Sequence, residues 1–126
     1  MKPALALSLL FFLLPIALVR AADAFPSYVE LTDEPTIAVD WTKSDTQAVT
    51  LHGNRVITFA NGQKGGKYLL IVRQDDTGSH TVTWPSSLRW PGTSPPALTT
   101  TANKKDFLSI FCDGVNYYGL GLSQNF

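Results

Sequence analysis

The sequence predicts an all-β fold, an antiparallel β-sandwich of the jelly-roll kind formed by a single domain. From Phe25 onward it has no sustained helical periodicity. Short stretches of alternating apolar and polar residues recur instead, with turn residues between them. Their spacing of about 8–12 residues is typical of a sandwich. We find no internal repeat long enough to indicate a solenoid or propeller.

The first half of the domain contains four expected strands with turns between them. The strands are residues 36–41, 48–51, 55–59 and 67–74. The last of these is the most apolar and is expected to lie at the centre of a sheet. After it, Asp75-Asp76-Thr77-Gly78 is predicted to form a tight turn, in which Gly78 can adopt a positive φ at little cost.

The second half is built around a loop with two Trp-Pro dipeptides, Trp84-Pro85 and Trp90-Pro91. Proline fixes φ at about −65° and favours an extended residue before it, so each tryptophan should sit on a stiff backbone. Residues 81–84 lead into this loop as a strand, and residues 95–103 form an extended connection. Residues 107–112 and 116–122 are then expected to form a hairpin around Asp113-Gly114.

The N-terminal segment has the features of a secretory signal peptide. Lys2 precedes an apolar run over residues 4–19, and Val19 and Ala21 provide the small side chains needed for cleavage before Ala22. We therefore divide the chain into a signal peptide (1–21), an N-terminal arm or first strand (22–35) and a β-sandwich module (36–126). The expected location is secreted, extracellular or periplasmic. The alternative is a retained anchor, in which case the chain contacts a membrane only through this uncleaved segment.

Composition narrows the function classes. Cleavage would leave 105 of the 126 residues and remove Lys2 and Arg20, which changes the net charge from 0 to −2. Such a chain lacks the dense basic patch that binds nucleic acid. Cys112 is the sole cysteine, which excludes an intrachain disulfide. His52 and His80 lie beside turns without ligand spacing, so they are expected to be solvated. We predict no metal or cofactor and no enzymatic activity.

The aromatic residues are the candidate ligand or interface contacts. Trp84 and Trp90 could stack on sugar rings, because an indole face offers a large contact area. The alternative is that one or both close the end of the sandwich. Tyr117 and Tyr118 are adjacent on an expected strand and must point to opposite faces. One should face the core, and the other should be exposed or lie at an oligomer interface.

The segment before the module is a candidate assembly arm. Apolar and polar residues alternate from Tyr28 through Val29 to Leu31, a pattern that favours a strand. An arm of this kind can add to the sheet edge of a neighbouring copy. The alternative is that it pairs within its own domain as a first strand. We expect self-association, with a trimer favoured.

Taken together, the motifs of residues 36–126 resemble a β module of tailed-phage virions. They are Val49-Thr50-Leu51-x-Gly53-Asn54, Thr58-Phe59, Gly66-x-Tyr68-x-Leu70, Gln74-Asp75-x-x-Gly78, Thr81-Val82-Thr83-Trp84-Pro85, Trp90-Pro91-Gly92, Ala102-Asn103-Lys104-x-Asp106, Asp113-Gly114, Tyr117-Tyr118-Gly119 and Gln124-Asn125-Phe126. Such modules end tail-fibre, tailspike and minor structural proteins. The resemblance implies a β-sandwich in an adhesive or structural appendage, often trimeric, with no chemistry of its own.

These observations favour a non-enzymatic structural or adhesion module of an extracellular or viral appendage. The alternative is a secreted or periplasmic carbohydrate-binding module that uses Trp84 and Trp90, with a surface glycan as partner. A small secreted hydrolase ranks below both, because the sequence shows no catalytic constellation. A signal peptide before a phage-like module leaves open whether the protein is viral or cellular, and a virion-associated location remains one alternative.

Overall fold

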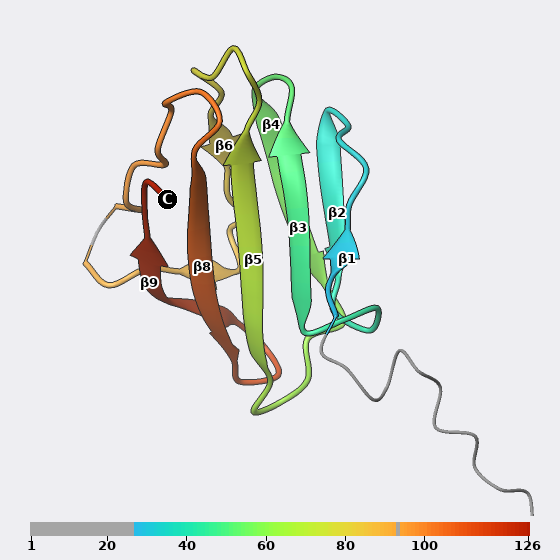
Figure 1. Cartoon of the computed structure of the whole chain (residues 1–126). Helices are drawn as coiled ribbons and strands as arrows, with labels where there is room; N and C mark the ends of the chain where they lie inside the picture. The colour runs from blue at the N-terminus through green and yellow to red at the C-terminus, as the bar shows by residue number, and fades with distance from the viewer. Residues whose placement is uncertain (1–26, 93) are drawn as a thin grey trace, which may run out of the picture.

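The computed structural model describes residues 27–92 and 94–126, which form two β-sheets (Figure 1). The larger sheet has the strand order β1-β3-β5-β8-β9-β7, and the smaller has the order β2-β4-β6. The strands are β1 (Val29–Glu30), β2 (Thr36–Asp40), β3 (Thr46–Leu51), β4 (Arg55–Ala60), β5 (Lys67–Gln74), β6 (Val82–Thr83), β7 (Leu88–Arg89), β8 (Lys105–Cys112) and β9 (Tyr117–Ser123). The predicted all-β class is confirmed. In these residues no helix is long and apolar enough to cross a bilayer.

Strand direction differs from the antiparallel, jelly-roll arrangement that we expected. From β1 to β6 the chain alternates between the two sheets, so each strand pairs in parallel with the strand two places along. Antiparallel pairing is confined to β5–β8 and β8–β9 in the described part of the chain. The turn at residues 52–54 carries the chain across the core instead of folding it back into a hairpin. Over the first six strands, the chain therefore winds in successive turns of two strands each, which we call coils, and these coils stack on one another. The sequence has no repeat that would indicate this winding.

The core lies between the two sheets and is filled by alternate residues of their strands. Its most deeply buried aliphatic side chains are Ile37, Val39, Val49, Leu51, Ile57, Leu70, Leu108 and Ile110. β5 lies between β3 and β8, which confirms its predicted central position. Leu70 points inward and is fully buried, whereas Ile71 lies on the outer face and pairs with Phe107 of β8.

The smaller sheet covers only part of the larger one. It ends at β6, while the larger sheet continues through β8 and β9. Three side chains of the segment between β6 and β8, Trp84, Trp90 and Leu98, pack against the core cluster. This segment therefore takes the place of further strands in the smaller sheet.

One short strand, β7, was not predicted, and the predicted hairpin is present. β7 lies within the expected loop, and Leu88 and Arg89 pair in parallel with Tyr117 and Tyr118. β8 and β9 form the hairpin, closed by the hydrogen bond from the Asp113 amide to the Asn116 carbonyl. Farther along, a bulge opposite Ser109 leaves Leu120 of β9 out of register.

Candidate functional site

Trp84 and Trp90 lie together where the segment between β6 and β8 crosses the core. Their rings meet edge to face, with 5.7 Å between centroids and an interplanar angle of 66°. Both are half-buried and pack on the core cluster, as expected if they close the end of the sandwich. Each also retains exposed surface, so the structure leaves both tryptophans available to a ligand.

A mostly apolar hollow of about 260 Å³ opens beside Trp90, and we call it the Trp90 groove. Its lining is Trp90, Pro91, Ser94, Pro96, Gly119, Leu120, Gly121 and Leu122. Two of its residues are prolines, whose fixed φ keeps the walls stiff. In the described chain, β7 pairs with β9 no farther than Tyr118, so the edge of β9 beside the groove has no strand neighbour.

Two more hollows border the tryptophans. One lies on the polar side of Trp90 and is lined by Ser86, Leu88, Arg89, Trp90, Gly92, Ser94 and Pro95. The other, of about 310 Å³, includes Trp84, Val82, Pro96 and Leu98. Trp90 thus borders both an apolar hollow and a second hollow lined by serine hydroxyl groups and the Arg89 guanidinium.

Tyr117 and Tyr118 point to opposite faces, as predicted. Tyr117 is buried, its ring meets Phe59 edge to face, and its hydroxyl accepts a hydrogen bond from the Gly62 amide at 2.8 Å. Burial raises the pKa of Tyr117, which has little surface left for a ligand. Tyr118 is exposed and donates to Asp113 Oδ2 at 2.8 Å, and this hydrogen bond raises the pKa of Tyr118.

The candidate arm residues lie against their own domain. Val29 is in β1 and pairs in parallel with Gln47 of β3. Leu31 packs on the core, and its amide donates to the Ala48 carbonyl at 2.7 Å. Tyr28 is exposed beneath the guanidinium of Arg73, which lies 5.8 Å from the ring centroid. The predicted signal peptide, residues 1–21, lies outside the described residues.

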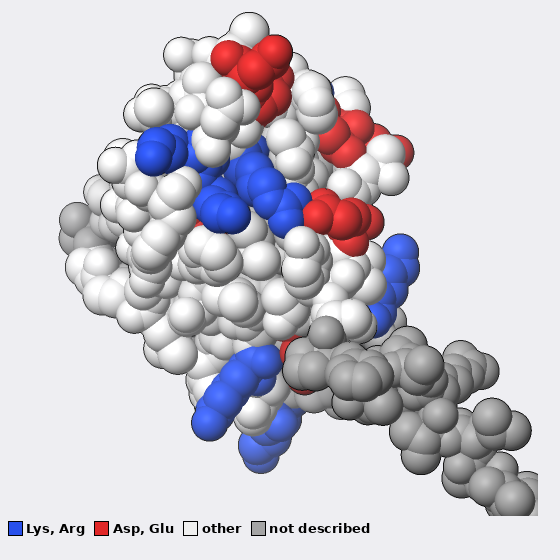
Figure 2. Space-filling model, viewed as in Figure 1, with Lys and Arg blue, Asp and Glu red and all other residues white. Residues whose placement is uncertain are grey.

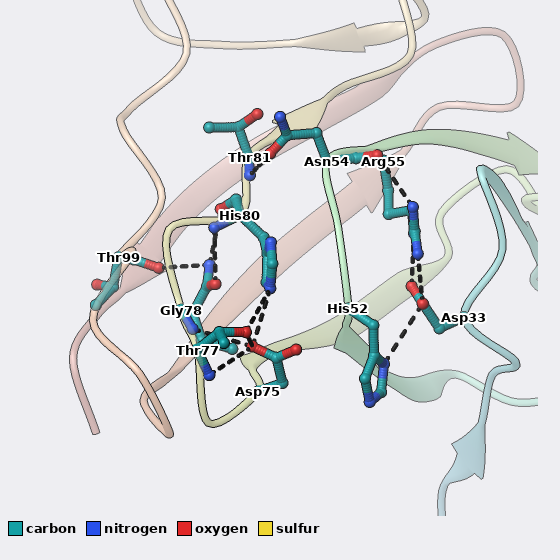
Figure 3. Close-up of polar contacts among 11 residues, drawn as sticks. Asp33, His52, Asn54, Arg55, Asp75, Thr77, Gly78, His80, Thr81 and Thr99 are labelled. Atoms are coloured by element: carbon teal, nitrogen blue, oxygen red, sulfur yellow. Dashed lines mark hydrogen bonds and ion pairs between the residues drawn. The ribbon is translucent and has the colours of Figure 1, made fainter.

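A polar cluster fills the turn after β5 (Figure 3). Asp75 Oδ1 accepts hydrogen bonds from the Thr77 hydroxyl at 2.7 Å and the Gly78 amide at 3.0 Å, and lies 2.9 Å from His80 Nε2. These contacts, that of Thr77 above all, hold the pKa of Asp75 well below its ordinary value. The His80 side chain is 15% exposed, so the expectation of a solvated His80 is wrong. His52, at 61% exposed, matches the expectation.

A second set of contacts joins successive coils at the same end of the molecule (Figure 3). Arg55 Nε and Nη2 donate to the two oxygens of Asp33 at 2.8 and 2.7 Å, and these hydrogen bonds lower the pKa of Asp33. Asn54 Oδ1 accepts from the Thr81 amide at 2.9 Å. The partners are 22 and 27 residues apart, so no local sequence pattern indicates these contacts.

The side chains of Asp33, Asp75 and His80 therefore stabilise turns and the contacts between neighbouring coils. Within residues 27–92 and 94–126, no group of three or more His, Cys, Asp or Glu side chains could hold a metal ion. Among the candidate contacts, the tryptophan hollows and the exposed Tyr118 are what this arrangement offers to a ligand.

Comparison with known proteins agrees with the resemblance drawn from the sequence. A family model described as "Putative phage tail fibre C-terminal domain" matches residues 32–117. The match begins just after β1 and ends at the first residue of β9, so it includes the Trp-Pro segment and seven of the strands between. No curated protein and no solved structure matches the chain.

Proposed function

The chain belongs to the family of phage tail fibre C-terminal domains, and from this premise we propose that it is a non-enzymatic adhesion module that holds a surface glycan in the Trp90 groove. Membership of the family makes it a structural module of a phage appendage, which is a virion-associated, extracellular component. Beyond family membership, we propose that the module is adhesive, that its ligand is a glycan and that residues 1–21 direct secretion.

The Trp90 groove is the observation that supports glycan binding. Sugar rings present apolar faces that pack on indole, and a groove with stiff walls requires little ordering when a ligand enters. Pro91 and Pro96 form stiff walls beside Trp90 and the Ser94 side chain also lines the groove, while Ser86 lines the adjoining polar hollow. This combination of an aromatic surface with a few polar groups is typical of small-ligand sites.

The roles of the acidic side chains support a module without catalysis. Asp75 and Asp113 each accept several hydrogen bonds within their own turns. Asp33 binds Arg55, and the buried Asp106 accepts from the Thr99 amide at 2.7 Å and the Asn125 amide at 3.0 Å. A catalytic carboxylate must instead present its oxygens to a substrate or to water.

Retention on immobilised bacterial surface polysaccharides tests glycan binding. We expect the wild type to bind and Trp90→Ala to lose retention. Trp90 also packs on the core, so Trp90→Ala could lose retention by unfolding, and Gly121→Phe serves as a second variant. Gly121 lines the groove, and a Cβ placed on it meets nothing within 4 Å, so the added ring should block the groove without disturbing the core. Val115→Phe, at a fully open site on the hairpin turn, is the matched control. Absence of wild-type retention, or full retention by Gly121→Phe, would contradict the proposal.

We also propose that the mature protein associates with itself, as a trimer in the favoured case. The two sheets have open edges at β1 and β2 in the described chain, and exposed strand edges readily pair with another chain. Residues 27–33, with Tyr28, Val29 and Leu31, lie at this end. Light scattering on the chain that begins at Ala22 should give three times the monomer mass, and a monomer mass would contradict this proposal.

A further inference from the structure

We propose that the glycan is acidic, and that it runs from the Trp90 groove over Leu120 onto the outer face of the six-stranded sheet, where Arg89 and Lys67 bind its anionic groups. This inference rests on the proposed function and specifies the ligand class. The shared chemistry is a sugar chain bearing carboxylates or phosphates.

A continuous path across the surface is the first argument. The Trp90 groove shares Trp90, Pro91, Gly119 and Leu120 with a hollow of about 340 Å³ that also includes Arg89 and Tyr118. Leu120 in turn lines a hollow of about 410 Å³ with Lys67, Leu69 and Ser109. The three hollows thus share Leu120, and we call the continuous surface that they form the trench.

The bulge in the β8–β9 ladder shapes this trench. Ser109 pairs with Gly121 and Ile110 with Gly119, so Leu120 has no partner on β8 and its side chain is 65% exposed. Bulges are often found where a side chain is redirected at a binding surface. On one side of Leu120 the exposed Gly121 has no side chain, and a Cβ built there would meet nothing within 4 Å, so the backbone at this position is open to a ligand.

Charge is the second argument. The whole chain has equal numbers of acidic and basic residues; on the face seen in Figure 2, basic side chains form one group in the upper half of the view and a pair at its lower edge, and acidic ones lie mostly toward the top and right margins. On β5, Lys67 and Arg73 lie on the outer face, and Arg73 is paired with Glu30 at 2.9 Å. Lys67 and Arg89 are exposed and form no ion pair with other described residues.

The acidic groups near the trench leave this charge largely uncancelled. Asp113 is occupied, because its carboxylate accepts from Tyr118, Val115 and Asn116. Asp45 lines the hollow of Lys67 and is the one carboxylate in the linings of the three hollows. Two cations against one acid favour an anionic chain over a neutral one, and two are too few to hold the phosphates of nucleic acid.

The same charges argue against a second copy of the chain as occupant. Packing two of these faces together would bring Lys67 and Arg89 close to their equivalents, and like charges in contact oppose association. Self-association is therefore assigned to the opposite end of the sheets, at β1 and β2, and the trench is assigned to the glycan.

Calorimetric titration with three polymers tests this inference. The probes are polygalacturonate, the same polymer with its carboxyl groups reduced to alcohols, and a teichoic acid with phosphodiester links. We expect at least one acidic polymer to bind about tenfold more tightly than the reduced one, with an affinity that falls as salt is added. Comparison of the two acidic polymers distinguishes carboxylate from phosphate as the group recognised.

Variants locate the contact. Arg89→Gln and Lys67→Gln should each weaken binding of the acidic polymer about three- to tenfold without changing thermal unfolding, because both side chains are exposed. Lys43→Gln, an exposed cation on the turn between β2 and β3, should bind as wild type.

The outcomes separate this inference from the proposed function. Equal affinity for the acidic and reduced polymers would overturn the acidic preference while leaving glycan binding standing. An acidic preference that survives both variants would overturn the path through Arg89 and Lys67. Failure to bind any of the three, together with failure on the immobilised polysaccharides, would overturn the proposed function itself.

Discussion

Gly119 lies directly beneath the indole of Trp90: a Cβ built on Gly119 would be 2.6 Å from Cε3 and Cζ3 of the ring. The absence of a side chain at this position of β9 is what allows the Trp90 ring to pack so closely on the sheet. The contact between Trp90 and Gly119 therefore has two roles: both residues line the Trp90 groove, and through it Trp90 also covers part of the core.

Replacement of Gly119 by alanine should displace Trp90. Overpacking of this kind should lower the free energy of unfolding by about 1–3 kcal/mol and increase the exposure of an indole. Urea unfolding followed by tryptophan fluorescence measures both effects. Gly121→Ala is the matched control two residues away, where an added methyl group meets nothing within 4 Å. Equal stability of the two variants would show that Trp90 does not rest on Gly119.

Leu70 should be among the most costly side chains to truncate. It is fully buried at the centre of the larger sheet, so Leu70→Ala should lower the free energy of unfolding by about 2–5 kcal/mol. Leu120→Ala removes the same atoms from an exposed site and should change it by less than about 0.5 kcal/mol. Urea midpoints for the two variants test the assignment, and similar values would contradict it.

Acid should destabilise the fold through Asp40. The Thr42 hydroxyl, at 2.7 Å, and the Asn61 amide, at 3.1 Å, lower the pKa of Asp40 from 3.8 to about 2. Because the pKa is lower in the folded state, this contribution is complete above pH 3.8 and is lost as the pH falls through about 2. Asp40→Asn should therefore flatten the fall in melting temperature over that range. Asp76→Asn, on an exposed turn, is the control, and an equal effect of both would refute the assignment.

The exported protein should begin at Ala22. Val19 and Ala21 offer the small side chains that signal peptidase requires before that residue. Intact mass spectrometry of protein recovered from outside the cytoplasm gives the answer directly. A mass that includes residues 1–21 would identify the segment as a retained anchor.

The strands were predictable because alternation of apolar and polar residues reports burial of one face. That signal placed β5 correctly and identified the β8–β9 hairpin, whose Asp113-Gly114 turn is local in sequence. It carries no information on which neighbour a strand pairs with. Strands joined by a turn that crosses the core show the same alternation as strands joined by a hairpin turn. The pattern therefore could not predict that β3 pairs in parallel with β5.

The candidate site was only partly predictable for a similar reason. Two stiff Trp-Pro dipeptides mark Trp84 and Trp90, and the alternation rule separates Tyr117 from Tyr118. The contact that shapes the site is distant in sequence, because Trp90 rests on Gly119, and the half-buried position of His80 depends on how its loop folds against Asp75. Two residues of β7, enclosed between prolines, give too short a pattern to predict a strand.

Tryptophan fluorescence during glycan binding shows whether Trp90 lies in the ligand site. Trp41 is 3% exposed, so changes in quenching by acrylamide report mainly on Trp84 and Trp90. With saturating acidic polysaccharide, we expect a blue shift and reduced quenching in the wild type, and neither in Trp90→Phe. A polysaccharide that binds while leaving the quenching of the wild type unchanged would contradict a ligand site at Trp90.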